Sequence, residues 1–208
     1  MPKKPFDTPV IDMLIHEEEA RSRGFQMVVG IDEVGRGPLA GPVVAAAVIL
    51  PRNPPLQGVC DSKKLSPSVR ELRCREILSC SSHVGIGLVE AAEIDRINIL
   101  QATFRAMVKA VEELRVSPDF LLIDGPYTLP LDIPQKGIPQ GDQKSLSIAA
   151  ASIVAKVHRD RLMCQYHALY PTYGFHENKG YGSRRHMEAI RLHGACPLHR
   201  KSFKGVLG

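Results

Sequence analysis

The sequence contains no tryptophan, and its 208 residues include only five tyrosines and six phenylalanines. A protein that binds single-stranded nucleic acid by base stacking needs a row of aromatic side chains. If this chain binds a nucleic acid, contacts to the backbone and the grooves are therefore expected to dominate. The five cysteines are odd in number and include no C-x-x-C pair. This usage is typical of reduced thiols in a cytosolic protein and not of a disulfide framework.

Long apolar runs are also lacking. The longest, such as residues 43–50, are too short to span a bilayer. No charged segment followed by an apolar one opens the chain, so no secretory signal is expected. Hydrophobic residues make up 44% of the chain and charged residues 24%, and both values are typical of soluble globular domains. We predict a cytoplasmic protein with no membrane partner.

The positive charge is concentrated in the last quarter of the chain. Residues 156–208 contain ten Lys or Arg and three Asp or Glu, a net charge of +7, whereas residues 1–155 have a net charge of −2. Positive charge gathered in one part of a protein indicates contact with a polyanion such as nucleic acid. A solvated basic face is the alternative interpretation.

Hydrophobic periodicity and turn residues divide the chain into strands and helices. Strands are predicted over residues 27–31, 43–50, 83–89, 120–123 and 137–139. Helices are predicted over residues 12–23, 67–78, 91–114, 145–169 and 184–193. This order of elements favours an α/β fold with a mixed central sheet flanked by helices, followed by a smaller helical part.

Four acidic residues follow predicted strands or precede a predicted helix. Asp32 and Glu33 end the first strand, Asp124 ends a later one, and Asp142 precedes the long helix over residues 145–169. Ligands of open α/β sheets bind outside the carboxyl ends of the strands. Converging carboxylates repel one another unless cations neutralise them, and oxygen ligands suit Mg²⁺ or Mn²⁺. Two such ions are a standard apparatus for attack on a phosphodiester.

Two objections apply to this interpretation. Neighbouring residues of a strand point to opposite faces, so Asp32 and Glu33 can share a site only if the strand ends or bulges there. The glycines and the proline that follow them would supply such an end. Taken singly, acids at strand ends more often form turns, and Asp142 is placed to cap the following helix.

Two further motifs suggest other chemistry. The glycine-rich residues 35–41 (GRGPLAG) follow a strand, as the dinucleotide-binding G-x-G-x-x-G does, but their spacing differs and a strand follows instead of a helix. We favour a loop whose glycines let the backbone approach a substrate closely. His193, Cys196 and His199 are spaced like zinc ligands, but they match no standard ligand pattern and Pro197 interrupts them.

Six sequence blocks then occur in a fixed order between residues 28 and 203. They are GIDEVGRGPLAGPVV at 30–44, DSKKLS at 61–66, IDG at 123–125, GD at 141–142 with AASIVAKVHRD at 150–160, YGF at 173–175 with NKGYG at 178–182, and HRKSF at 199–203. In this order they resemble the signatures of type 2 ribonuclease H (ribonuclease HII). One departure is Asn178, where the family more often has histidine.

The resemblance implies a ribonuclease-H-like mixed five-stranded sheet flanked by helices, with a small helical C-terminal appendage. The expected division is an N-terminal helix over residues 1–24, a catalytic domain over 25–169 and a basic substrate-binding part over 170–208. The implied activity is endonucleolytic: hydrolysis of the RNA strand of RNA/DNA hybrids, and nicking of duplex DNA 5′ of an embedded ribonucleotide to leave a 3′-hydroxyl and a 5′-phosphate. A monomer is expected, and the sequence identifies no protein partner.

The resemblance also implies roles for individual residues. Asp32, Glu33, Asp124 and Asp142 are the expected catalytic carboxylates, and they would bind two divalent cations, Mg²⁺ or Mn²⁺. These are the four acids that strand-end reasoning also selects.

A second set of residues is expected to bind the substrate. Its members are Gly35, Arg36, Gly37, Lys63, Lys64 and Tyr181. The glycine–arginine–glycine loop matches the family's loop that contacts the 2′-hydroxyl through its backbone, the group that distinguishes RNA from DNA. Tyr181 matches the tyrosine that packs on the sugar of the next nucleotide, and without the resemblance it would be interpreted as a core aromatic. The two lysines are expected to reach phosphates, with surface solubility as the alternative.

Two other classes of function remain. A non-catalytic nucleic-acid-binding module would explain the basic last quarter but not four acids at one edge of a sheet. Another nuclease on the same fold would share the carboxylates but not the glycine–arginine–glycine loop together with Tyr181.

Overall fold

A computed structural model describes residues 13–56, 59, 62 and 65–207. Its centre is a five-stranded sheet with the strand order β3–β2–β1–β4–β5. The strands are β1 (Val28–Val34), β2 (Val43–Ile49), β3 (His83–Val89), β4 (Phe120–Asp124) and β5 (Gln135–Ile138). Strands β1, β2 and β3 pair antiparallel, whereas β4 and β5 continue the sheet in parallel from β1. The predicted mixed five-stranded sheet is confirmed.

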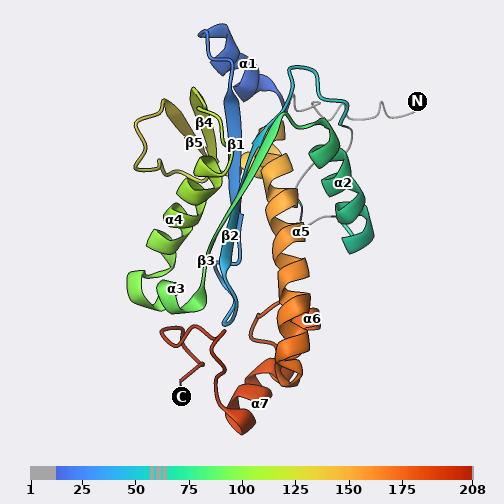
Figure 1. Ribbon diagram of the computed structural model, residues 1–208, viewed down its shortest axis with the longest axis vertical. Helices are drawn as coiled ribbons and strands as arrows, with labels where there is room; N and C mark the ends of the chain where they lie inside the picture. Colours follow the sequence, from blue (N-terminus) through green and yellow to red (C-terminus); the bar gives the residue numbers. More distant parts are fainter. Residues whose placement is uncertain (1–12, 57–58, 60–61, 63–64, 208) are drawn as a thin grey trace, which may run out of the picture.

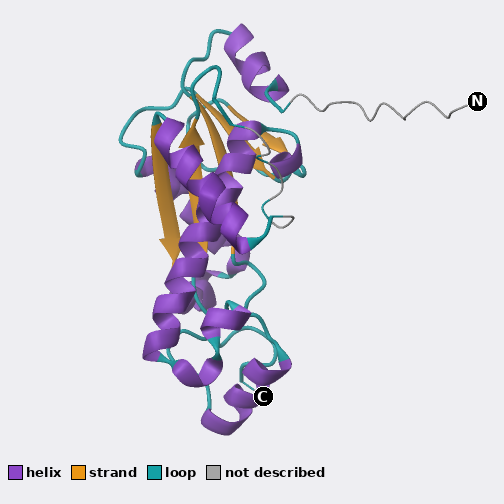
Figure 2. Cartoon of the chain, turned by 90° about the vertical axis from the view of Figure 1, so that its right-hand side faces the viewer, coloured by secondary structure: helices purple, strands orange, loops and turns teal. Residues whose placement is uncertain are grey.

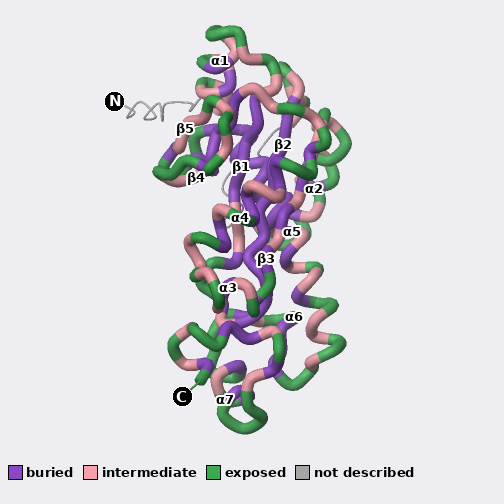
Figure 3. Tube along the Cα trace, turned by 60° about the vertical axis from the view of Figure 1, so that its left-hand side comes forward, coloured by how far each residue is buried: buried purple, intermediate pink, exposed green. Residues whose placement is uncertain are grey.

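Helices cover both faces of this sheet (Figure 1). They are α1 (Ile15–Ser22), α2 (Pro67–Cys80), α3 (Ala91–Ile97), α4 (Ile99–Glu112), α5 (Leu146–Leu169), α6 (Phe175–Asn178) and α7 (Arg184–His193). Alternate residues of the central strands face opposite sides: Val29 and Ile31 pack with α4, whereas Ala46 and Val48 pack with α5 and α2. Figure 3 shows the buried positions concentrated along these central strands.

Helix α5 lies directly against β1, and glycine makes this approach possible. A Cβ atom at Gly30 would lie only 2.1 Å from the carbonyl carbon of Ser147. Side chains along a strand alternate, so Asp32, two residues further along, shares the face that α5 covers. The close packing of α5 therefore determines what surrounds this carboxylate.

The start of α5 is fixed by hydrogen bonds from two elements. Ser145 is its N-cap and accepts from the backbone N–H of Ile148. The buried Glu17 of α1 accepts from the hydroxyls of Ser145 and Ser147 at 2.7 and 2.6 Å. Asp142 lies earlier, in the 3₁₀ turn Gly141–Gln143. The alternative interpretation of Asp142 as the cap of this helix is therefore wrong.

The single helix predicted over residues 91–114 is wrong, because the chain turns at Asn98. This residue has a φ of 68°, and it ends α3 and begins α4. Its side-chain oxygen accepts from the N–H groups of Leu100 and Gln101 at 3.0 and 3.1 Å. Asparagine tolerates the left-handed region and caps helices well. The apolar periodicity continues across this break, so the hydrophobic pattern did not reveal it.

The C-terminal part extends the molecule beyond the sheet (Figure 2). It has a small core of its own, in which Tyr173, Phe175 and Ile190 pack with Met163 of α5 and with Ala40. The predicted helical appendage is thus confirmed, while the division at residues 24 and 169 stays a prediction. Among the described residues, no helix combines the length and apolar character needed to cross a membrane.

Candidate active site

Three carboxylates meet at the carboxyl ends of β1 and β4. The two strands are parallel, and their last paired residues are Ile31 and Ile123, so Asp32 and Asp124 follow at equivalent positions. One oxygen each from Asp32, Glu33 and Asp124 lies within 4.8 Å of the others. In the part of the chain that the structure describes, this is the one such group of metal-ligating side chains.

The expectation that β1 must end or bulge to bring Asp32 and Glu33 together is wrong. Strand β1 continues to Val34, and both acids keep regular antiparallel register with β2. Pairing with β4, however, stops at Ile31, which leaves the other edge of β1 open from Asp32 onward. The N–H of Glu33 donates to Oδ1 of Asp32 at 2.7 Å. The two side chains meet because this edge lacks a partner strand, and not because the strand is distorted.

These acids line a cavity of about 220 Å³. Its lining residues are Asp32, Glu33, Val34, Ser62, Asp124, Asp142, Ser152, Lys156 and Tyr181. The N–H of Gly141 donates to Oδ1 of Asp124 at 2.6 Å, which ties the turn that carries the buried Asp142 to the end of β4. All four predicted carboxylates therefore face one cavity, although Asp142 lies outside the tightest group.

The carboxylates destabilise one another's charged forms. Burial raises the pKa of Asp32 well above its usual range, and the charges of Glu33 and Asp124 raise it further. Burial also raises the pKa of Glu33, against the opposing effect of Arg36, whose guanidinium lies 3.4 Å from its carboxylate. A divalent cation would remove this repulsion, and oxygen-only ligands suit Mg²⁺ or Mn²⁺. The residues present therefore fit such ions.

Three cavity residues had no predicted role in the site. Ser152 of α5 lines the cavity, and its hydroxyl favours the charged form of the Asp32 carboxylate. Ser62 lies 2.9 Å from Ser152, hydroxyl to hydroxyl. The ammonium of Lys156 pairs with Asp160 at 2.7 Å. The AASIVAKVHRD block contains Ser152 and Lys156 four residues apart, and helical spacing at four residues is the signal that could have placed them on one face.

The glycine–arginine–glycine loop and Tyr181 lie side by side. Gly35 has a φ of 93°, a backbone conformation that favours glycine. A Cβ atom at Gly37 would lie 3.7 Å from Cε1 of the Tyr181 ring. Tyr181 is 49% exposed and lines the acidic cavity, so the alternative of a core aromatic is wrong. Lys63 and Lys64 lie outside the described residues.

Asn178 holds the turn that leads to Tyr181. Its amide group donates to the carbonyl of Tyr173 at 2.7 Å, and its side-chain oxygen accepts from the N–H of Gly180 at 2.7 Å. Its backbone carbonyl accepts from the N–H of Tyr181. The departure from the family pattern at this position therefore keeps its local hydrogen bonds.

Two buried histidines support Tyr181 from behind. Nδ1 of His199 accepts from the N–H of Cys196 at 2.9 Å, so the ring proton lies on Nε2, which faces Nε2 of His186 at 3.0 Å. His186 in turn donates from Nδ1 to the carbonyl of Tyr181 at 2.8 Å. This chain of donors needs both rings neutral. It uses His199 for a hydrogen bond and not as a zinc ligand.

We expect this histidine pair to destabilise the protein in acid. Burial lowers the pKa of His186, and burial together with His186 lowers the pKa of His199 to about 4. The unfolded chain, with an ordinary histidine pKa near 6.5, binds more protons in this window. Stability from the pair is therefore complete above about pH 6.5 and is lost as the pH falls toward 4. Histidine ring titration by NMR checks this expectation, and a normal titration of His199 would contradict it.

Comparisons with known proteins agree with this geometry. The sequence model of the family described as Ribonuclease HII matches residues 29–206. Ribonuclease HII of Syntrophobacter fumaroxidans is 66% identical over 206 residues, which cover 99% of this chain and 88% of that protein. Ribonuclease HII of Bacillus subtilis is 53% identical over 94% of this chain and 76% of its own length.

Solved structures share the fold. Ribonuclease H2 from Pyrococcus horikoshii OT3 superposes with a TM-score of 0.71 at 27% identity, over 86% of this chain and 94% of that one. The PCNA:RNase HII complex from Archaeoglobus fulgidus gives 0.74 at 27% identity, over 86% and 96%. Sequence and fold thus agree along almost the whole length of the protein. The chain belongs to the ribonuclease HII family, and it is an endonuclease of the ribonuclease H type.

Proposed function

We propose that this protein is a metal-dependent endonuclease with two related substrates. It hydrolyses the RNA strand of RNA/DNA hybrids, and it nicks duplex DNA 5′ of an embedded ribonucleotide, leaving a 3′-hydroxyl and a 5′-phosphate. The observation that carries the proposal is the shared cavity, in which Tyr181 and the carboxylates Asp32, Glu33 and Asp124 lie together with the loop of Gly37 at its edge.

In this proposal, Asp32, Glu33, Asp124 and Asp142 hold two divalent cations, Mg²⁺ or Mn²⁺. When bound, such ions activate water and stabilise the charge that develops on the leaving oxygen. The chain's own contribution is to hold the carboxylates close together. The N–H of Glu33 bonds to Asp32, Arg36 pairs with Glu33, and the N–H of Gly141 bonds to Asp124.

Substrate selection is assigned to the loop and to the tyrosine. The backbone of Gly35, Arg36 and Gly37 contacts the 2′-hydroxyl, which DNA lacks. The exposed ring of Tyr181 packs on the sugar of the following nucleotide. Lys63 and Lys64 keep their proposed role at phosphates.

We also propose that the enzyme acts as a cytoplasmic monomer, because one chain supplies every residue assigned to the site. The Archaeoglobus protein was solved in complex with PCNA. A protein partner of this kind is a candidate for this chain too.

Three duplexes test the proposed function: one with a single embedded ribonucleotide, a uniform RNA/DNA hybrid, and all-DNA. We expect nicking of the first and degradation of the RNA strand of the second with Mg²⁺ or Mn²⁺, and no reaction with a chelator. End analysis should find a 3′-hydroxyl and a 5′-phosphate. Binding without cleavage at saturating metal would indicate a non-catalytic module. Cleavage of the all-DNA duplex at a similar rate would indicate another nuclease on the same fold.

A second prediction concerns the basic helix α7. Arg184 and Arg185 are exposed at its start, and Arg185 also pairs with Glu177 at 3.1 Å. If both contact phosphates, changing them to alanine should weaken binding to every duplex. The slope of log K against log salt should fall by up to about 0.9 per lost contact. The ratio of cutting at a ribonucleotide to cutting of plain DNA should change little.

The control is the double substitution Arg52→Ala with Arg115→Ala, which removes the same charge from exposed positions. Arg52 lies beside α1, at the opposite end of the molecule from α7 (Figure 1). Salt slopes that are equal for the two double variants would assign the α7 arginines to a solvated face.

A further inference from the structure

Two arginines are completely buried beneath the glycine–arginine–glycine loop and the segment that carries Tyr181. Arg159 of α5 and Arg200 near the C-terminus each have 0% exposure. Within the described residues, no carboxylate oxygen lies within 4.0 Å of either guanidinium. Burial lowers the pKa of Arg159 to about 10 and of Arg200 to about 9, so both stay charged at neutral pH. Burying charge without an opposite charge is costly, and an apolar side chain would fill the same space at lower cost.

Arg200 binds the inner side of the glycine–arginine–glycine loop. It donates to the carbonyls of Gly35, Arg36 and Gly41 at 2.6, 2.9 and 3.0 Å. In a trans peptide group the N–H points away from the C=O. The peptide groups whose carbonyls face Arg200 therefore direct the N–H groups of Arg36 and Gly37 away from it. A hydrogen bond to a charged donor also polarises the peptide group and strengthens its N–H as a donor.

Arg159 joins the backbone that directly follows this loop to the segment that carries Tyr181. It donates to the carbonyls of Pro42 and Ala40 at 3.0 and 3.2 Å, and to the carbonyl of Lys179 at 2.9 Å. Lys179 is two residues before Tyr181. The planar guanidinium presents its donors in a fixed fork, so one side chain fixes both pieces of backbone at once.

The backbone that follows the loop and the segment that carries Tyr181 also contact each other directly, so they are closely packed. The N–H of Leu39 donates to the carbonyl of Gly180 at 2.8 Å. A Cβ atom at Gly180 would lie 2.3 Å from the carbonyl oxygen of Ala40. A shift of either piece would therefore change the gap between Gly37 and Tyr181, in which the ribonucleotide would lie under the proposed function.

We propose that Arg159 and Arg200 are positioning residues for substrate selection. Arg200 sets the direction of the loop's N–H groups, and Arg159 sets the distance between the loop and Tyr181. Neither side chain reaches the carboxylates, so both act on the choice of substrate and not on the metal site. This inference rests on the proposed function, since it assigns a role within that selection.

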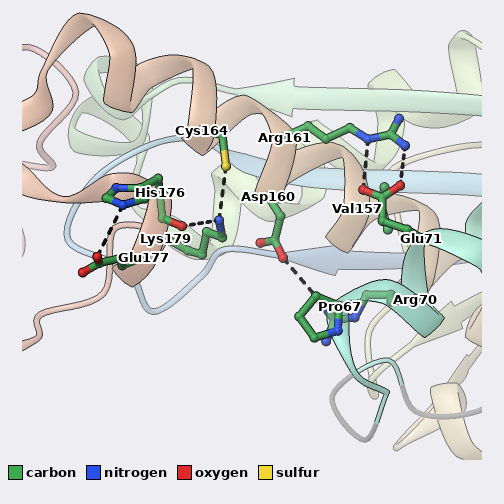
Figure 4. Close-up of a pocket in the computed structure, with 10 residues that line it drawn as sticks. All are labelled: Pro67, Arg70, Glu71, Val157, Asp160, Arg161, Cys164, His176, Glu177 and Lys179. Carbon is green, nitrogen blue, oxygen red and sulfur yellow. Dashed lines mark hydrogen bonds and ion pairs between the residues drawn. The ribbon is translucent and has the colours of Figure 1, made fainter.

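The test compares Arg159→Lys and Arg200→Lys with Arg161→Lys. Lysine keeps the charge but replaces the planar fork with a single ammonium. Arg161 lies two residues along α5 from Arg159 and has a side chain 57% exposed, which pairs with Glu71 of α2 beside a cavity of about 510 Å³ (Figure 4). It is the matched control, because the same substitution is made on the same helix at a side chain that bonds neither to the glycine–arginine–glycine loop nor to the segment that carries Tyr181.

The test uses three measurements: hydrogen exchange, cleavage kinetics and a Mn²⁺ titration. Hydrogen exchange should rise in peptides covering residues 35–42 and 178–183 in both buried variants, and stay unchanged in β1 and β2. For nicking at a single ribonucleotide, kcat should fall about 10–100-fold, the scale expected of a misplacement near 1 Å, with a smaller change in KM. Cutting of a uniform hybrid should fall less than nicking in Arg159→Lys, because the hybrid offers no ribose-to-deoxyribose step to Tyr181. In Arg200→Lys both reactions should fall to a similar extent, because both substrates carry the 2′-hydroxyl that the loop contacts. Mn²⁺ titration of the protein alone should be unchanged. The Arg161 variant should match the wild type throughout.

Equal losses on both substrates in Arg159→Lys, an unchanged kcat in Arg200→Lys, or unchanged exchange of the two segments in either variant would overturn the proposal. If the wild-type protein cut no ribonucleotide-containing duplex, the proposed function itself would fail, which is a separate outcome. Should the buried variants melt below the assay temperature, Asn178→Ala loosens the Tyr181 segment without touching an arginine, since it removes the bonds to Gly180 and Tyr173. It should lower the ratio of single-ribonucleotide to hybrid cutting, and an unchanged ratio would refute the dependence on this geometry.

Discussion

Asp124→Asn is expected to lower kcat by more than about 100-fold. Losing a residue that merely orients a metal ligand costs about 10–100-fold, so losing a charged ligand should cost more. Asparagine keeps an oxygen that can accept from the N–H of Gly141, as Oδ1 of Asp124 does at 2.6 Å, and the fold should therefore survive. Substrate binding should persist, because under the proposed function the phosphate contacts come mainly from the basic part of the chain. Single-turnover cleavage with Mg²⁺ or Mn²⁺ measures the effect.

The matched control for this variant is Asp132→Asn. Asp132 is exposed and lies in the connection between β4 and β5, so it loses the same charge a short distance along the chain. Activity close to that of the wild type in Asp124→Asn at saturating metal would remove Asp124 from the metal site.

Tyr181→Ala is expected to slow nicking at a single embedded ribonucleotide by about ten- to a hundredfold, because stacking contacts of this kind contribute about 1–3 kcal/mol. The ring lies next to Gly37 at the edge of the acidic cavity. Under the proposed function the ring contacts the substrate only when the junction is correctly seated, so its loss should appear in kcat as well as in affinity. A uniform RNA/DNA hybrid has no ribose-to-deoxyribose step, and its cleavage should suffer less.

Tyr181→Phe serves as the control, since it keeps the ring and removes only the hydroxyl. It should retain most of the activity. The melting temperature should change little in either variant, because Tyr181 is 49% exposed. Equal losses on both substrates together with a lower melting temperature would instead assign Tyr181 a structural role.

That the carboxylates lie together could be predicted from the sequence, for a physical reason. Buried strands are short apolar runs, and the carboxyl ends of parallel neighbours meet at one edge. Asp32 and Asp124 follow such runs, and the register of β1 with β4 places them side by side. The position of Glu33 was harder to predict, because it depends on where the pairing of β1 with β4 stops. A local sequence pattern does not determine where strand pairing ends.

The arginines and Ser152 were missed because their environments are tertiary. Arginine is normally exposed, so a sequence gives no sign that Arg159 and Arg200 are buried against carbonyls from distant segments. Ser152 has the size that helix packing needs, and it lines the same cavity as Asp32 only because α5 lies against Gly30. Tyr181 could be assigned by resemblance alone, since one tyrosine in a turn has no distinguishing pattern.

Helix α5 also fixes the distance between the acidic cavity and the backbone segments next to Gly37 and Tyr181. It contributes Ser152 to the acidic cavity and, seven residues later, Arg159 to the carbonyls of Ala40 and Lys179. Seven residues of α-helix advance about 10 Å and complete almost two full turns, so both side chains leave the helix in nearly the same direction. One inserted residue between them would rotate one end against the other by about 100°. Insertions and deletions in this stretch of α5 should thus be far less tolerated than substitutions on its outer surface. Chimeric enzymes should exchange α5 together with the glycine–arginine–glycine loop and the segment that carries Tyr181.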